Sequence, residues 1–92
     1  MNDLNILRQK IDEIDDKIVE LISQRFKQTN EIGLIKAHGE LPLVDENRES
    51  EIISRLLEKS ETLSLNPDLI TSIYRSILTE VVSNHNLLMK KE

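Results

Sequence analysis

Residues 4–37 of this chain, which decide its fold, read LNILRQKIDEIDDKIVELISQRFKQTNEIGLIKA. Apolar side chains recur in this stretch three and four positions apart, a spacing typical of the apolar seam of a coiled coil. The seam consists of Leu4, Leu7, Ile11, Ile14, Ile18, Leu21, Ile32 and Ile35. The pattern predicts one long helix from about residue 3 to about residue 37, ended by Gly39 in the left-handed conformation that glycine adopts readily.

This helix is too long for a compact monomer of 92 residues to bury it. At ~1.5 Å per residue, about 35 residues form a rod of ~50 Å, whereas a globule of this size is ~25–30 Å wide. Only 38% of the chain is hydrophobic, so its own core would be marginal. We therefore predict that a second copy of the chain covers the seam and that the protein is a homodimer.

The rest of the sequence predicts two further helices and no strand. Asp45 is a suitable N-cap for a helix over residues 45–62. The Asn-Pro-Asp sequence at residues 66–68 predicts the start of a third helix, because proline is favoured in the first turn. The fold class is therefore all-α, with three helices in a single domain that spans residues 1–92.

A loop is predicted between the first two helices, over residues 38–44. Gly39 and Pro42 both interrupt a helix there. Because Leu41 and Val44 are apolar, we expect both side chains to turn inward.

Composition and charge argue against several classes of protein. The chain has no cysteine, and His38 and His85 lack the spacing of metal ligands, so we expect neither a disulfide nor a metal site. A net charge of −5 argues against nucleic-acid binding, which needs a basic face. No apolar run approaches the ~20 residues that cross a membrane. The first residues also lack the basic and then apolar pattern of a signal peptide, so we expect a cytoplasmic protein.

The residues most informative about function are polar residues at positions where the helix pattern predicts apolar ones. Continuing the seam by one heptad places Arg25 and Gln28 on it. Two interpretations fit: a polar position that sets pairing specificity, or a seam that opens into a polar cavity. Arg8 and Lys36 flank the seam, either as solvated charges or as ligand-binding groups. His85 lies on the apolar stripe of the third helix, either as a hydrogen-bonded core residue or as a catalytic one.

Helix geometry limits which of these charges can meet. Arg25 and Lys36 are eleven residues apart, which puts them on one face at ~16 Å, so that their long side chains can converge on one small ligand. Arg8 is seventeen residues from Arg25, or ~25 Å, and cannot reach that ligand within one chain. In an antiparallel pair of first helices, Arg8 of one chain approaches Arg25 of the other, which gives two equivalent sites.

Three stretches together resemble a known family. The first, LRQKIDEID at residues 7–15, is followed by Ile18, Leu21, Ile22 and Arg25; the second is Gly33 with Lys36; the third is DENRE at residues 45–49. In this order they resemble the all-helical chorismate mutases, over about residues 4–88. The resemblance implies three helices per chain in an intertwined dimer, and the rearrangement of chorismate to prephenate without a metal or cofactor.

The resemblance also implies how the small dianionic substrate would be held. Arg8 from the partner chain and Arg25 would each bind a carboxylate, for which the planar guanidinium is well suited. Lys36 would donate to the ether oxygen as negative charge develops there. Arg48 would support the carboxylate side of the site.

The remaining implied roles concern the substrate's ring hydroxyl and the breaking bond. Glu49 would accept a hydrogen bond from the hydroxyl, with Asp45 at the same edge. The family usually places a glutamine eleven residues after an aromatic as a second donor to the ether oxygen; counted from Tyr74, that position is His85. Because Val81 also replaces a residue that is often polar, two other substrates stay open: isochorismate, by pyruvate elimination, and aminodeoxychorismate, by rearrangement. A non-catalytic dimerisation or regulatory module is a further alternative.

Overall fold

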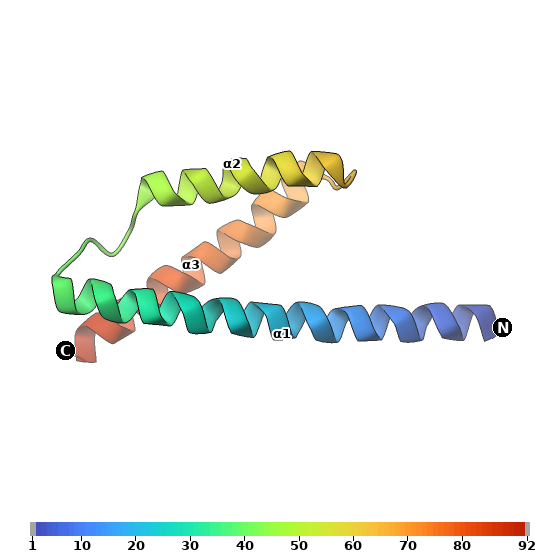
Figure 1. The fold of residues 1–92 in the computed structure, drawn as a ribbon, viewed down its shortest axis with the longest axis horizontal. Coiled ribbons are helices and arrows are strands. Elements are labelled where there is room, and N and C mark those ends of the chain that lie inside the picture. Colours follow the sequence, from blue (N-terminus) through green and yellow to red (C-terminus); the bar gives the residue numbers. More distant parts are fainter. Residues whose placement is uncertain (1, 92) are drawn as a thin grey trace.

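The computed structural model describes residues 2–91, and these form three helices. Helix α1 spans Asn2–Gly39, α2 spans Glu46–Thr62 and α3 spans Pro67–Lys91 (Figure 1). Within these residues there is no strand. The predicted all-α class, the number of helices and their approximate bounds are confirmed.

Helix α1 is a rod that extends well beyond the other two helices at its N-terminal end (Figure 1). It has 38 residues, and the longest dimension of the molecule is 57 Å. The apolar seam along the projecting part is exposed: Leu7 keeps 56% of its accessible surface, Ile14 55% and Leu21 61%. A single chain therefore leaves the seam uncovered, as the length of the helix predicted.

The core of the single chain is small. Helix α3 packs against both α1 and α2. Among the described residues, the only large apolar side chains that are buried are Ile52 of α2 and Leu78 of α3. Two buried polar residues, Ser60 and His85, lie in the same helix pair. This core agrees with the expectation that the chain alone would be marginally stable.

The end of α1 differs from the prediction, because Gly39 does not adopt the left-handed conformation. The helix continues through Gly39, and the next residue, Glu40, has a φ of 54°. The Leu41 N–H then donates to the Lys36 carbonyl oxygen at 2.9 Å. This six-to-one bond is typical of a Schellman motif, in which the left-handed residue follows the last helical one. The helix therefore ends two residues beyond the predicted end near residue 37, and the left-handed position lies one residue later than predicted.

The loop that follows also differs from the prediction. Leu41 is 48% exposed and Val44 is 44% exposed, so neither turns inward. Leu41 instead folds back over the last turn of α1, where a Cβ on Gly39 would lie 3.4 Å from its Cγ. The residue that turns inward is Leu43, which is half-buried.

Helix α2 ends in a second Schellman motif, and this one predicts a stabilising substitution. Ser64 has a φ of 58°; its N–H donates to Glu61 O at 3.2 Å, and the Leu65 N–H donates to Ser60 O at 2.9 Å. Since the left-handed conformation is costly for any residue with a Cβ, Ser64→Gly should raise the free energy of unfolding by about 0.5–1 kcal/mol. The matched control, Ser54→Gly inside α2, should lower it by about 0.5 kcal/mol. Urea denaturation of both variants measures the difference; a destabilised Ser64→Gly would contradict this account of the helix end.

Candidate active site

A cavity of about 120 Å³ lies where the C-terminal half of α1, the start of α2 and the C-terminal half of α3 come together. Six of the seven site residues predicted from the sequence line it. They are Arg25, Lys36, Asp45, Arg48, Glu49 and His85. A wider hollow of about 520 Å³ shares Lys36 and Asp45 with this cavity. Together the two spaces offer room for a small molecule.

Helix α1 contributes two cations to the cavity. Arg25 is half-buried, and its Nη1 is buried with no hydrogen-bond partner among the described residues. Its guanidinium carbon lies 5.7 Å from the centre of the Tyr74 ring. Lys36, three turns further along, donates from Nζ to the Leu43 carbonyl oxygen at 3.4 Å, which is long for such a bond. Both cations therefore keep hydrogen-bond donors with which to bind an anion.

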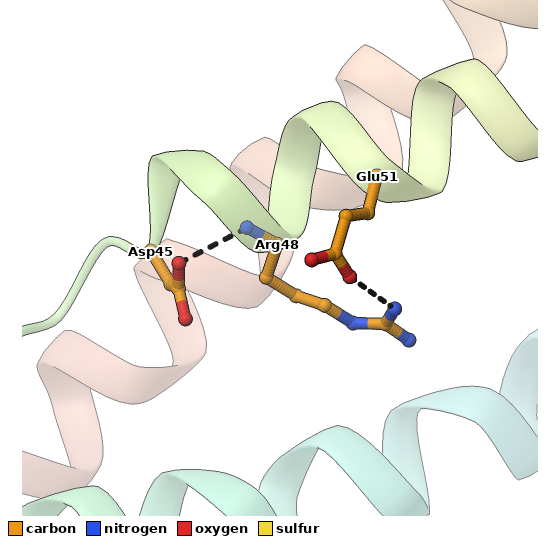
Figure 2. A network of polar contacts seen from close by, with 3 residues as sticks. All are labelled: Asp45, Arg48 and Glu51. Atoms are coloured by element: carbon orange, nitrogen blue, oxygen red, sulfur yellow. Dashed lines mark hydrogen bonds and ion pairs between the residues drawn. The ribbon is translucent and has the colours of Figure 1, made fainter.

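The start of α2 places three more charged residues at the cavity. Asp45 is the N-cap, and its Oδ1 accepts from the Arg48 N–H at 3.0 Å. Figure 2 shows the Arg48 side chain leaving α2, with its Nη1 3.4 Å from a carboxylate oxygen of Glu51. Glu49 is half-buried beside them. The capping hydrogen bond and the first helical turn therefore fix the backbone positions from which these side chains extend.

His85 is buried where α3 crosses α1, with 2% of its surface exposed. Its Nε2 lies 2.7 Å from the Thr29 carbonyl oxygen, and because a carbonyl only accepts, the ring donates. Gly33 makes room for this contact, since a Cβ there would lie 2.6 Å from the His85 ring. Nδ1 is buried and has no partner among the described residues.

The Thr29 contact was not foreseen, because any residue type supplies a backbone carbonyl and no sequence signal marks it. Leu43 was also missed, since the loop pattern favoured its neighbours. Both residues line the cavity. Gly33 appeared only as part of the family resemblance, although a glycine inside a long helix is itself a signal of close approach.

The cavity is cationic although the chain is acidic. Three cations (Arg25, Lys36 and Arg48) face two carboxylates (Asp45 and Glu49), a formal balance of +1. The whole chain carries −5. A local excess of positive charge in an acidic protein suits a small anionic ligand.

Arg8, the seventh predicted residue, does not reach this cavity in the single chain. It is exposed on the projecting part of α1, seventeen residues from Arg25, or ~25 Å along the helix. Within residues 2–91, no cluster of side chains is suited to hold a metal ion. The helices of the same part of the chain are too short or too polar to span a membrane.

The chain matches a known family over most of its length. A sequence profile described as chorismate mutase type II covers residues 7–86. The chain belongs to this family. Among its relatives in this family, the T-protein of Enterobacter agglomerans is 29% identical over 84 residues, which are 91% of this chain and 22% of that protein.

Two further relatives differ in length. The bifunctional chorismate mutase/prephenate dehydratase of Aquifex aeolicus is 33% identical over 86 residues, 90% of this chain and 24% of that protein. The chorismate mutase of Methanocaldococcus jannaschii is 28% identical over 86 residues, 94% of this chain and 82% of that protein. The chain thus spans about a quarter or less of the T-protein and the bifunctional enzyme, and most of the shorter mutase.

Proposed function

We propose that this chain is a chorismate mutase, which rearranges chorismate to prephenate and works in the cytoplasm as a homodimer with two shared active sites. The observation that carries the proposal is the cavity, where three cations gather in a chain of net charge −5. The reaction is an isomerisation within one molecule: a carbon–carbon bond forms, an ether carbon–oxygen bond breaks, and no atom leaves. It needs no metal, cofactor or covalent intermediate.

The residues of the cavity supply what such a reaction needs. Chorismate is a dianion, and fixing its two carboxylates selects the compact conformer that reacts. Arg25 would bind one carboxylate, and its unpartnered buried Nη1 supports this role. Lys36 would leave the Leu43 carbonyl to stabilise the charge that builds on the ether oxygen. Arg48 would support the carboxylate side, while Glu49 and Asp45 would face the ring hydroxyl.

The second carboxylate needs a further cation, which we assign to the partner subunit's Arg8. Pairing the exposed seams of two α1 rods would bury large apolar side chains that now face solvent. An antiparallel pair would carry the partner subunit's Arg8 to the cavity near Arg25, raising its formal charge from +1 to +2. That charge would balance a bound dianion.

Product analysis tests the reaction directly. The purified protein is incubated separately with chorismate, isochorismate and aminodeoxychorismate, and the products are identified by mass and by absorbance. We expect prephenate from chorismate and little turnover of the other two. Pyruvate released from isochorismate would instead indicate a lyase, and a rearranged aminodeoxychorismate would indicate a different mutase. No turnover of any of them would favour the non-catalytic module.

The dimer is tested by dilution. Because the projecting seam is exposed in a single chain, dissociation should cost the chain its fold, and no stable folded monomer is expected. Sedimentation velocity across a dilution series, with circular dichroism at each concentration, should show a helical dimer that loses helix as it dissociates. A well-folded monomer at micromolar concentration would contradict the proposal.

His85 should contribute to both stability and turnover. Its Nε2–H is taken by Thr29, so the neutral ring offers only an acceptor at Nδ1, and a hydrogen bond to the ether oxygen needs the doubly protonated ring. His85→Gln should keep activity. His85→Ala should lose about 2–4 kcal/mol of catalysis.

The alternative for His85 is a purely structural histidine. In that case His85→Ala would lower the melting temperature, because the Thr29 carbonyl would lose its partner, but turnover per folded site would stay the same. Turnover and melting temperature measured on the wild type and both variants separate the two roles.

A further inference from the structure

Tyr74 does not line the cavity, but it contacts one of the cavity's cations, Arg25. The guanidinium carbon of Arg25 is 5.7 Å from the centre of the Tyr74 ring, within the ~6 Å at which a cation is attracted to an aromatic face. Both side chains are half-buried. The contact bridges α1 and α3, since Arg25 belongs to the first helix and Tyr74 to the third.

The register of α3 places the Tyr74 ring beside Arg25 but outside the cavity. Tyr74 is followed on the same face, at four, seven and eleven residues, by Leu78, Val81 and His85. All three of these residues line the cavity, and Tyr74 does not. The ring therefore lies one helical turn before the part of α3 that lines the cavity. There it can contact Arg25 without occupying the space of a ligand.

Arg25 needs such support because its position is costly for a cation. Its Nη1 is buried and has no hydrogen-bond partner among the described residues. A desolvated cation without a carboxylate is unfavourable, and an aromatic face compensates part of that cost without using a hydrogen-bond donor. A carboxylate of the protein at the same place would neutralise the guanidinium and compete with an anionic ligand.

We propose that Tyr74 is a positioning residue, whose ring face holds the Arg25 guanidinium in the orientation that binds a substrate carboxylate. The inference rests on the proposed function, because it concerns the binding of the same dianion. Tyr74 touches neither the substrate nor the reacting atoms. It acts through Arg25, and it is the face of its ring that matters, so that its hydroxyl group is dispensable.

The test compares Tyr74→Phe, which keeps the ring, with Tyr74→Leu, which keeps an apolar side chain without one. In Tyr74→Leu we expect KM for chorismate to rise about 3- to 30-fold, the range given by the strength of cation–π contacts, with kcat changed much less. Tyr74→Phe should stay within about 2-fold of the wild-type KM. Melting temperatures of both variants show whether the fold is intact, and a merely structural role would change these without moving KM. An unchanged KM in Tyr74→Leu, or an equal rise in both variants, would overturn the proposal.

A double variant shows whether Tyr74 acts through Arg25. In an Arg25→Gln background the cation is gone, so adding Tyr74→Leu should cost no further kcat/KM. A second loss as large as in the wild-type background would overturn the proposal.

An NMR measurement keeps the test independent of activity. The side-chain protons of Arg25 should be shielded by the ring current in the wild type and in Tyr74→Phe, and should move downfield in Tyr74→Leu. If the wild-type chain turns over no chorismate, the proposed function fails, and this signal alone decides the proposal: shielding that Tyr74→Leu removes supports it, and Arg25 protons unaffected by Tyr74→Leu overturn it.

Discussion

Replacing Lys36 by alanine should lower kcat by about 100- to 1000-fold, with a much smaller change in KM. Lys36 lines the cavity, and its Nζ has only a long, 3.4 Å contact with the Leu43 carbonyl oxygen. In the proposed function its ammonium would stabilise the charge that develops on the ether oxygen. That charge develops only as the bond breaks, so the interaction is stronger in the transition state than in the ground state. Removing one preorganised donor of this kind typically costs ~3–4 kcal/mol.

A matched variant separates this effect from a general change of charge. Lys27 is an exposed lysine of α1 that does not line the cavity, and Lys27→Ala removes the same charge from the same helix. We expect kcat for Lys27→Ala within about 2-fold of the wild type. If Lys36→Ala behaved like Lys27→Ala, Lys36 would not be the donor to the ether oxygen.

The second large effect is expected at the two arginines. Arg25→Ala and Arg8→Ala should each lower kcat/KM by about 100- to 1000-fold, because each would leave one carboxylate of the substrate without its guanidinium partner. The two arginines occupy different places in the fold. Arg25 lines the cavity of its own chain, whereas Arg8 is exposed on the projecting half of α1. Steady-state kinetics of both variants, with circular dichroism to verify folding, measures them.

The position of Arg8 makes it the sharper of the two tests. A solvated charge on an exposed helix face contributes little to catalysis. If the chain acts alone, Arg8→Ala should therefore leave kcat/KM nearly unchanged. A large loss would require that Arg8 contacts substrate bound by another chain.

The helices of this protein could be predicted from the sequence because their signals are local. The three-and-four spacing of the seam, the cap at Asp45 and the proline at residue 67 all act within a turn or two of the chain. The exact helix end could not be predicted in the same way. Whether Gly39 or Glu40 takes the left-handed conformation depends on which carbonyl accepts the last hydrogen bond, and here that carbonyl belongs to Lys36.

Arg25 was predictable as a cavity residue for a different reason, whereas Asp45, Arg48 and Glu49 entered as site residues only through the family resemblance. Arg25 interrupts an apolar seam, and a charge at such a position needs a polar space, which the structure provides as the cavity. The contacts of these residues were not predictable. The carbonyl of Thr29 and the ring of Tyr74 lie on other turns or other helices from the groups they contact, so they emerge only from the packing of α1 on α3.

Complementation between the two arginine variants tests the central claim most directly. Arg8→Ala and Arg25→Ala are mixed in equal amounts, unfolded and refolded together. Random pairing puts about half of the dimers in the mixed form, and one of the two sites in each would hold an intact Arg25 and an intact Arg8 from the other chain. We therefore predict recovery of about one quarter of the wild-type activity from two nearly inactive proteins. If mixed dimers form, as shown by native mass spectrometry, and no activity returns, the shared active site is contradicted.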